Sequence, residues 1–246
     1  MPPDARWICM HNRVSAYFTK KFGGDWSYHD YRNFDVQRMV PAAEELTRRG
    51  YYVVRVGSVQ RDRMATDNPM IVDYASSPHR SEFGDIYLNA TCAAYIGSDS
   101  GIASSQLAFR RPVSYINFSQ SIVDVIPKQG CYWLPFIVKH LHHRGLGRRL
   151  SLREMFERGL FHAGDWGKFA SADVSVVSNT PEEIRDLEIE VAERLFGSWA
   201  PAAEDEVLQR RFWEIVREYD PAIDVGSTAT ARIGAMFLRQ HRYLLA

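Results

Sequence analysis

Short apolar runs rich in β-branched residues alternate with longer stretches of mixed polarity in the first half of the chain. Runs of this kind fit strands that are buried on both faces, and the stretches between them are long enough to form helices. The pattern predicts an α/β fold: a doubly wound, mainly parallel sheet of five or six strands, similar to a Rossmann fold. The predicted strands are residues 7–11, 51–57, 70–74, 93–98 and 113–118.

The helices predicted between these strands are marked by their ends. Residues 40–49 have Pro41 in the first turn, two Glu–Arg pairs spaced by four residues, and Gly50 directly after the last turn. Proline at a helix start and glycine just past its end are typical of the two termini. Residues 102–109 carry apolar side chains at the spacing of a short helix that packs on the sheet.

The second half of the chain has few strand signals and many helix start signals. Residues 151–154 and 180–183 match the capping box, in which Ser or Thr precedes Glu by three positions. Further helices are expected near 203–219 and 230–242. Between residue 118 and a strand at 174–177 the pattern predicts no strand.

These signals predict one domain with two parts. Residues 1–150 form the Rossmann-like core, and residues 151–246 form an α-helical extension packed on the same domain. Residues 119–150 are rich in Gly and Pro and are predicted to be an irregular connection across the top of the sheet.

Composition narrows the class of partner. The 246 residues include 30 Lys plus Arg and 30 Asp plus Glu, so no net charge favours nucleic acid or an anionic membrane. Cys9, Cys92 and Cys131 are far apart, which favours neither disulfides nor a thiolate zinc site. No apolar run approaches the roughly 20 residues that span a bilayer. A cytoplasmic protein that binds a small molecule is therefore expected.

The segment Tyr-Ile-Gly-Ser-Asp-Ser-Gly at 95–101 carries the main chemical signal. It runs from a strand through small residues into a helix, where free N–H groups bind phosphate. A diphosphate site is therefore predicted here, although serine caps on an ordinary turn explain the same pattern. The spacing matches neither the Walker motif nor G-x-G-x-x-G. The predicted binding residues are Ser98, Asp99, Ser100, Gly101, Ser104 and Ser105.

His11 and Arg13 follow the first predicted strand, at the edge where open α/β sheets bind ligands. Arginine suits phosphate, and histidine can transfer a proton near neutral pH. The alternative is a loop arginine paired with an acid such as Asp30 or Asp35. The loop that follows is about 25 residues long and contains Asp30, a second candidate for proton transfer, as Asp99 is.

Arg55, Gly57 and Asp73 stand at the ends of the next two strands. Arg55 is a candidate for the anion site, and Asp73 for a base or ribose hydroxyl. A salt bridge at the strand ends is the ordinary alternative for both. Because the ends of parallel strands meet at one edge, these groups are predicted to share a pocket with the turn at 98–101.

A serine hydrolase and a metal site are less well supported by the sequence. Ser100 is not at the centre of a G-x-S-x-G elbow, because Asp99 occupies that position, so a serine hydrolase is disfavoured. The basic run at 139–149 contains His140, His142 and His143, but no carboxylate at ligand spacing beside them. A phosphate or lipid-headgroup contact, or a solvated face, is preferred there, and no metal site is predicted.

The order of motifs along the chain resembles a family of bacterial glycosyltransferases tied to surface-polysaccharide synthesis. The matching motifs are HNR, the Arg32-Asn33 pair, VVRVGS, IVDYASS, GDIYLNATCAAYIGSDSG, RRPVSYIN, GRRLSLREM, SNTPEEIRD and FLRQHRYLL. More remotely, the chain is similar to the fucosyltransferase superfamily. By that resemblance His11 and Arg13 match an H-x-R motif, and Ser104, Ser105 and Gln106, with Ser100 and Gly101, match a diphosphate cradle.

The resemblance implies the donor-binding half of a GT-B fold that works without a metal ion or other cofactor. Its partners would be a nucleotide-diphosphate sugar and a glycan or lipid-linked acceptor. A peripheral contact of the protein with the inner membrane is compatible with this function. The family also carries an N-terminal acceptor domain, whereas here the first strand begins at Trp7. Three alternatives follow: part of a longer protein, a donor domain that needs a separate acceptor-domain partner, or a compact variant whose helices after residue 150 shape the acceptor side. A homo-oligomer is a further candidate, because the helices after residue 180 carry Trp199, Phe212 and Trp213. A non-catalytic nucleotide-sugar binding module is the alternative function.

Overall fold

The computed structural model describes residues 1–119, 134–221 and 231–246. Cys131, much of the connection predicted at 119–150, and the predicted helix start at residue 230 lie outside these ranges. A membrane-spanning segment would need a helix longer and more apolar than any found among the described residues.

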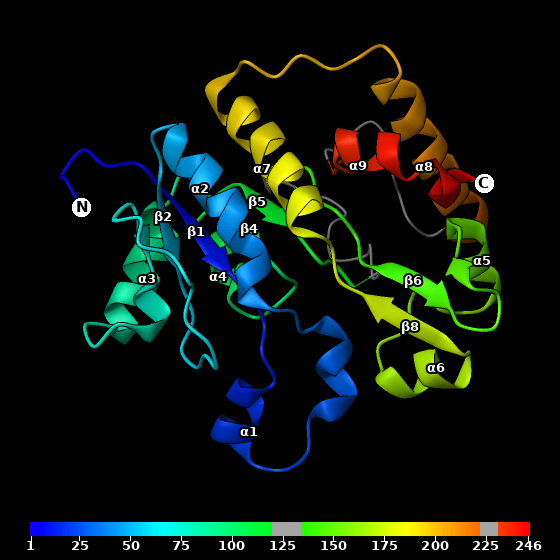
Figure 1. Ribbon diagram of the computed structural model, residues 1–246, viewed down its shortest axis with the longest axis horizontal. Helices are drawn as coiled ribbons and strands as arrows, with labels where there is room; N and C mark the ends of the chain where they lie inside the picture. Colours follow the sequence, from blue (N-terminus) through cyan, green and yellow to red (C-terminus); the bar gives the residue numbers. More distant parts are fainter. Residues whose placement is uncertain (120–133, 222–230) are drawn as a thin grey trace.

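The five predicted strands are confirmed as one fully parallel sheet (Figure 1). The strand order, β3-β2-β1-β4-β5, places the first strand at the centre, where the chain direction of the crossovers reverses. Ile8, Cys9 and Met10 of the central strand have no exposed surface, as expected for a strand covered on both faces. The strands are β1 (Trp7–His11), β2 (Tyr52–Arg55), β3 (Ile71–Val72), β4 (Ala94–Gly97) and β5 (Val113–Tyr115).

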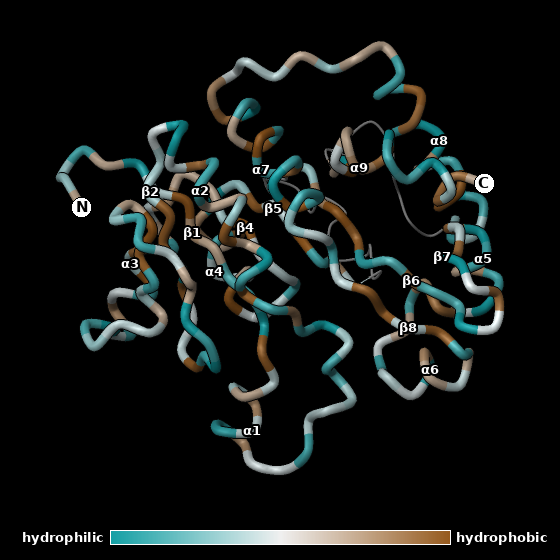
Figure 2. Tube along the Cα trace, in the orientation of Figure 1, coloured by the Kyte–Doolittle hydropathy of each residue, from teal (hydrophilic) through white to brown (hydrophobic). Residues whose placement is uncertain are grey.

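Helices cover this sheet, and Figure 2 shows that hydrophobic residues concentrate along its central strands. The predicted helix at 40–49 is confirmed as α2 (Val40–Arg48), followed by Gly50 at φ 85°. The predicted helix at 102–109 is α4 (Ala103–Ala108). Two helices were not specified by the pattern: α1 (Ala16–Phe22), which buries none of its residues, and α3 (Glu82–Thr91). Short 3-10 turns are η1 (Ser27–Arg32), η2 (Val36–Met39) and η3 (Tyr74–Ser76).

A second sheet corrects the prediction that no strand lies between residues 118 and 174. It is antiparallel, in the order β7-β6-β8, and comprises β6 (His140–His143), β7 (Arg148–Arg149) and β8 (Val174–Val177). The sequence of β6, His-Leu-His-His, lacks the apolar alternation of an ordinary strand, because its buried polar side chains are paired within the protein. The second half is therefore not purely helical.

The helices of the second half begin where the capping boxes predict. Ser151 caps α5 and Thr180 caps α7, each with the reciprocal bond from the glutamate three residues later. Gly197 ends α7 in the left-handed conformation. The helices are α5 (Leu152–Glu157), α6 (Trp166–Ser171), α7 (Pro181–Phe196), α8 (Asp205–Tyr219) and α9 (Ala235–Gln240), with a 3-10 turn η5 (Arg242–Leu245) at the end.

Helix α7 connects the two halves of the molecule. It packs along α2 of the first sheet on one side and contacts α9 on the other (Figure 1). Strands β6 and β7 lie before residue 150 and β8 lies after it, so the second sheet takes strands from both sides of the predicted boundary. Phe212 on α8 is buried and Trp213 packs against the core, so both contribute to the chain's own interior.

Candidate functional site

A cavity of about 420 Å³ opens at the carboxyl ends of β1, β2 and β4. Its volume falls within the range of small-molecule sites, and its position is where open α/β sheets bind ligands. His11 and Arg13 after β1, Gly57 after β2, and Ser100 and Gly101 after β4 all line it. The structure therefore brings the residues that follow three of the strands into one pocket. The other lining residues are Val14, Tyr17, Phe18, Arg32, Ser58, Val59, Asp85, Ile86, Asn89, Ile102 and Ser105.

Arg13 is held in place by hydrogen bonds that do not use all of its donors. Its backbone N–H donates to Ser98 Oγ at 3.0 Å, and its Nη1 donates to His29 O at 3.1 Å and to Asn33 Oδ1 at 2.6 Å. The residue is only 4% exposed, and its Nη2 has no hydrogen-bond partner among residues 1–119, 134–221 and 231–246. A buried guanidinium nitrogen without an acceptor is costly. Such a group is suited to a ligand that brings an anionic oxygen of its own.

The turn between β4 and α4 lines the same cavity with residues 100–102. The N–H groups of Ser100, Gly101 and Ile102 donate to no acceptor in the described part of the chain. Gly97, opposite His11 in the sheet, has no room for a side chain, since a Cβ would lie 2.6 Å from His11 O. Because α4 has only six residues, its dipole is short, and the individual amides are the relevant donors.

His11 is arranged as a neutral imidazole with one free nitrogen. Its Nδ1 lies 2.9 Å from Val56 O. A carbonyl can only accept, so Nδ1 carries the proton and Nε2 keeps its lone pair. Burial, together with the cations of Arg55 and Arg13, lowers the pKa of His11 to about 4 against the opposing effect of the Val56 bond. Nε2 is therefore an acceptor at neutral pH.

A charged cluster stands behind the cavity and fixes its polar wall. Arg32 donates to Asp99 O, and its Nε lies 3.3 Å from Asp99 Oδ2. Asp99 also accepts from Ser119, and burial raises the pKa of its carboxyl. Lys139 Nζ donates to Asn33 O at 2.7 Å, and burial lowers its pKa to about 7. Asn33 thus contacts both Lys139 and Arg13, which links the second sheet to the cavity.

Arg55 and Asp73 are paired with each other rather than with the cavity. Arg55 Nη1 lies 3.1 Å from Asp73 Oδ2, and the guanidinium also donates to Asn12, Gln60 and the Asp62 carbonyl. Arg55 is fully buried, and neither it nor Asp73 lines the cavity. The structure therefore shows the strand-end salt bridge that was the alternative to ligand binding.

The remaining predicted residues divide by position. Ser98 has no exposed surface and supports Arg13 from behind, whereas Ser105 reaches the cavity wall. Ser104 is exposed and does not line the cavity. Asp30 is also exposed, and its carboxylate accepts from Asn33 Nδ2 at 2.7 Å. Gln106 is buried against Asn89 instead of facing the cavity.

Residues of α1 and α3, which were not among the predicted site residues, form another part of the cavity wall. Tyr17 and Phe18 supply aromatic surface, Ile86 adds an apolar contact, and Asp85 adds a carboxylate. Asp85 is paired with Arg80 through one oxygen, while its Oδ1 has no partner. The cap of α3 is a signal that was available: Ser81 accepts from Gly84 N at the helix start.

Comparison with known proteins gives little beyond this geometry. No family model matches the chain. No curated protein matches it. Two crystal structures of the dodecameric, iron-containing glycosyltransferase TibC are similar over 54% of this chain, each with a TM-score of 0.33. One is heptosyltransferase TibC in complex with ADP-D-β-D-heptose, at 16% identity over 34% of that chain. The other is TibC from enterotoxigenic E. coli H10407, at 15% identity over 35% of that chain.

The matched part thus covers about a third of the TibC chain. A TM-score of 0.33 is too low to support an argument about fold or function. The topology of the five-stranded sheet and the groups around its cavity therefore carry the functional argument by themselves.

Proposed function

We propose that the cavity binds the diphosphate of a nucleotide sugar and that the chain is the donor-binding part of a glycosyltransferase. The supporting observation is that Arg13, whose Nη2 finds no acceptor among the described residues, and residues 100–102, whose amides are free in the same part of the chain, line one pocket. Charge-assisted bonds from a guanidinium and from backbone N–H groups are the usual means of holding a diphosphate.

The same groups would act on the leaving group. As the bond between the sugar and the diphosphate breaks, negative charge grows on the diphosphate oxygen, and donors already in position stabilise it. His11 Nε2 would accept the proton of the acceptor hydroxyl as that oxygen bonds to the sugar carbon. A bound diphosphate would raise the pKa of His11 by offsetting the nearby cations, which improves it as a base.

The acceptor side of the proposal comes from the motif resemblance alone. It names a glycan or a lipid-linked acceptor in bacterial surface-polysaccharide synthesis, with a partner domain or a second copy supplying part of the acceptor site. Asp30 and Asp99 are weaker candidates for the base, because Asp30 is exposed beside the cavity and Asp99 is already engaged by Arg32.

Calorimetry with UDP, GDP, CDP and ADP tests the donor site. The Arg13→Ala variant should bind the preferred diphosphate about 100-fold more weakly, since it loses a charge-assisted contact. Arg13→Lys keeps the charge without the fork and should fall between the two. Lys20→Ala, on the exposed face of α1, is the matched control for loss of a nearby positive charge. Equal affinity of Arg13→Ala and the wild-type protein would refute the assignment.

A non-catalytic nucleotide-sugar binding module is the second candidate, favoured by the low pKa of His11, which makes it a weak base in the free protein. Slow hydrolysis of the preferred donor distinguishes the two. A competent transferase site transfers some sugar to water, and this activity should disappear in His11→Gln while diphosphate binding remains. A binding module shows no hydrolysis in either protein.

A further inference from the structure

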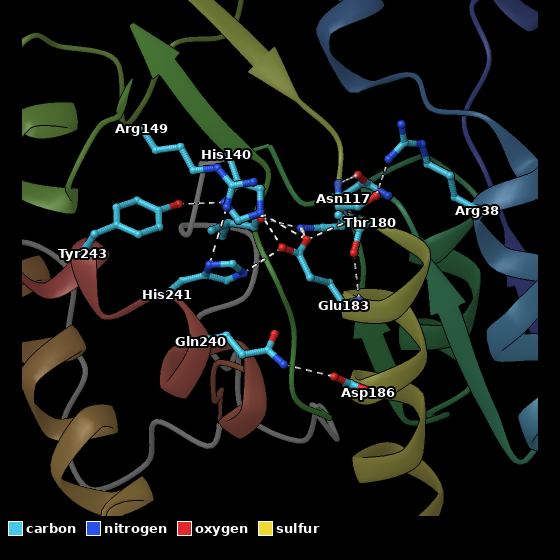
Figure 3. A network of polar contacts seen from close by, with 12 residues as sticks. Arg38, Asn117, His140, Arg149, Thr180, Glu183, Asp186, Gln240, His241 and Tyr243 are labelled. Carbon is cyan, nitrogen blue, oxygen red and sulfur yellow. Dashed lines mark hydrogen bonds and ion pairs between the residues drawn. The ribbon is translucent and has the colours of Figure 1, made fainter. Parts of the chain in front are cut away.

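Three side chains meet where the second sheet joins α7 and the end of the chain. His140 lies on β6, Glu183 in the first turn of α7, and His241 between α9 and η5 (Figure 3). Their potential ligand atoms all lie within 4.8 Å of one another. None of the three lines the cavity at the edge of the parallel sheet, so this cluster is separate from the proposed donor site.

Both imidazoles address the same carboxylate oxygen. His140 Nε2 lies 2.9 Å from Glu183 Oε1, and His241 Nε2 lies 2.7 Å from it. Two histidines and one carboxylate are a common donor set for Zn²⁺, with metal–ligand distances of about 2.0–2.2 Å. Ligand atoms around a tetrahedral ion stand roughly 3.3 Å apart, so each imidazole nitrogen would need to move about half an ångström away from Glu183 Oε1 to admit the ion.

The outer contacts of the cluster already orient these groups. The Tyr243 hydroxyl lies 2.7 Å from His140 Nδ1. Glu183 Oε2 accepts from Thr180 N at 3.0 Å and from Asn179 Nδ2 at 3.2 Å, and it also lies 3.1 Å from His140 Nε2. Oε1 is the oxygen that contacts both imidazoles (Figure 3). Metal-binding histidines and carboxylates are usually fixed by such outer contacts.

The cluster also has access to solvent and one opposing charge. A second cavity, of about 580 Å³, is lined by His241, Tyr243, Arg149 and Ser151. His241 is the member of the cluster that lines this cavity, whereas His140 and Glu183 do not. Arg149 Nη1 lies 3.5 Å from His241 Nδ1, the ring nitrogen that faces away from Glu183. This cation would weaken the binding of another cation.

We propose that His140 Nε2, His241 Nε2 and the Glu183 carboxylate form a binding site for a divalent transition-metal ion of the Zn²⁺ class, with water as the fourth ligand. Each imidazole would move its proton from Nε2 to Nδ1. The Tyr243 hydroxyl can accept the proton of His140, whereas the new N–H of His241 would displace Arg149, which now donates toward that nitrogen. The ion would join β6, α7 and the last turn of the chain, three segments that are far apart in sequence. Its role is structural, since it fastens the C-terminal segment onto the second sheet.

Metal titration of the full chain after treatment with a chelator tests the site. One equivalent of Co²⁺ should bind and give the visible absorption of a tetrahedral complex, and Zn²⁺ should displace it and raise the melting temperature. Glu183→Gln and His241→Gln should each bind Co²⁺ at least about tenfold more weakly. Glu182→Gln and His79→Gln, both at exposed positions, are the matched controls.

Arg149→Gln provides a measurement that a folding defect cannot imitate. It leaves all three ligands in place and removes the opposing charge, so Co²⁺ should bind several-fold more tightly. The proposal is overturned if the wild-type chain binds no stoichiometric Co²⁺ or Zn²⁺ at about 100 μM, or if Glu183→Gln and His241→Gln bind as the wild type does. The first result would leave the cluster as a hydrogen-bond network only. Either result leaves the diphosphate proposal untouched, because that site uses other residues.

Discussion

The polar groups at the carboxyl ends of β1 and β4 differ from those at the ends of β2 and β3 in whether they have partners within the protein. At the ends of β1 and β4, Arg13 has one nitrogen that meets no acceptor in the described ranges, and the three residues with free backbone amides line a cavity. At the ends of β2 and β3, Arg55 is fully buried and bonded to Asn12, Gln60, Asp62 and Asp73. The first part is ready for a ligand that brings acceptors, whereas the second supplies its own and serves stability.

The largest effect is expected on stability, at the ends of β2 and β3, where Arg55 bonds to other residues of the chain. Arg55→Leu should lower the free energy of unfolding by about 3–5 kcal/mol, because it leaves the Asp73 carboxylate and two amide oxygens without their donor. Urea denaturation measures this loss. Arg61→Leu, at an exposed position, should change stability by no more than about 0.5 kcal/mol. If Arg13→Ala proved as destabilising as Arg55→Leu, the contrast between the two parts of the edge would be lost.

Low pH should destabilise the folded chain through His11. The pKa of His11 in the folded chain is about 4, below its ordinary value of 6.5, so the unfolded chain takes up the proton first as pH falls. The wild-type protein therefore loses stability between pH 6.5 and 4. Between pH 7 and 4.5 the free energy of unfolding of His11→Gln should fall by about 1–2 kcal/mol less than that of the wild-type protein. Thermal melts from pH 7 to 4.5 test this.

His79→Gln, at an exposed position, is the matched control for the acid series. Identical pH profiles for His11→Gln and the wild type would show that His11 is not neutral in the folded state. NMR titration of the His11 ring adds a second check, since a bound diphosphate should raise its pKa.

The smallest effect concerns a carboxyl without a partner that faces no cavity. Glu188 on α7 is completely buried, neither of its oxygens has a partner in the part of the chain that the structure describes, and burial raises its pKa well above the ordinary value. For an acid with a raised pKa, stability falls as pH rises above about 4.5. Glu188→Met should therefore stabilise the chain by about 1 kcal/mol, more at pH 8 than at pH 5, without changing diphosphate affinity.

Melts of Glu188→Met at the two pH values, beside the exposed Glu182→Met, measure this gain. Destabilisation at pH 8 would mean that the Glu188 carboxyl has a partner in solution. A gain confined to stability would show that a missing partner marks a ligand site only where a cavity opens beside it.

The sequence predicted the fold more fully than the site. The five strands of the parallel sheet and the starts of α5 and α7 follow from apolar runs and caps, which are local signals. The polar strand β6 gave no such signal, because its buried histidine is balanced by Glu183, 43 residues away. In the same way, the sequence placed Arg13 and Arg55 at one edge but could not distinguish their roles.

Local spacing by itself determined which residues follow each strand, and parallel pairing then brought His11, Arg13 and the turn at 98–101 to one end of the sheet. Only the tertiary structure decided which of these groups meet partners, because a hydrogen bond depends on the final position of both atoms. Asp73 bonds to Arg55, whereas Arg13 Nη2 meets no acceptor among the described residues. Glu183 contacts both His140 and His241. Such long-range contacts leave no period in the sequence.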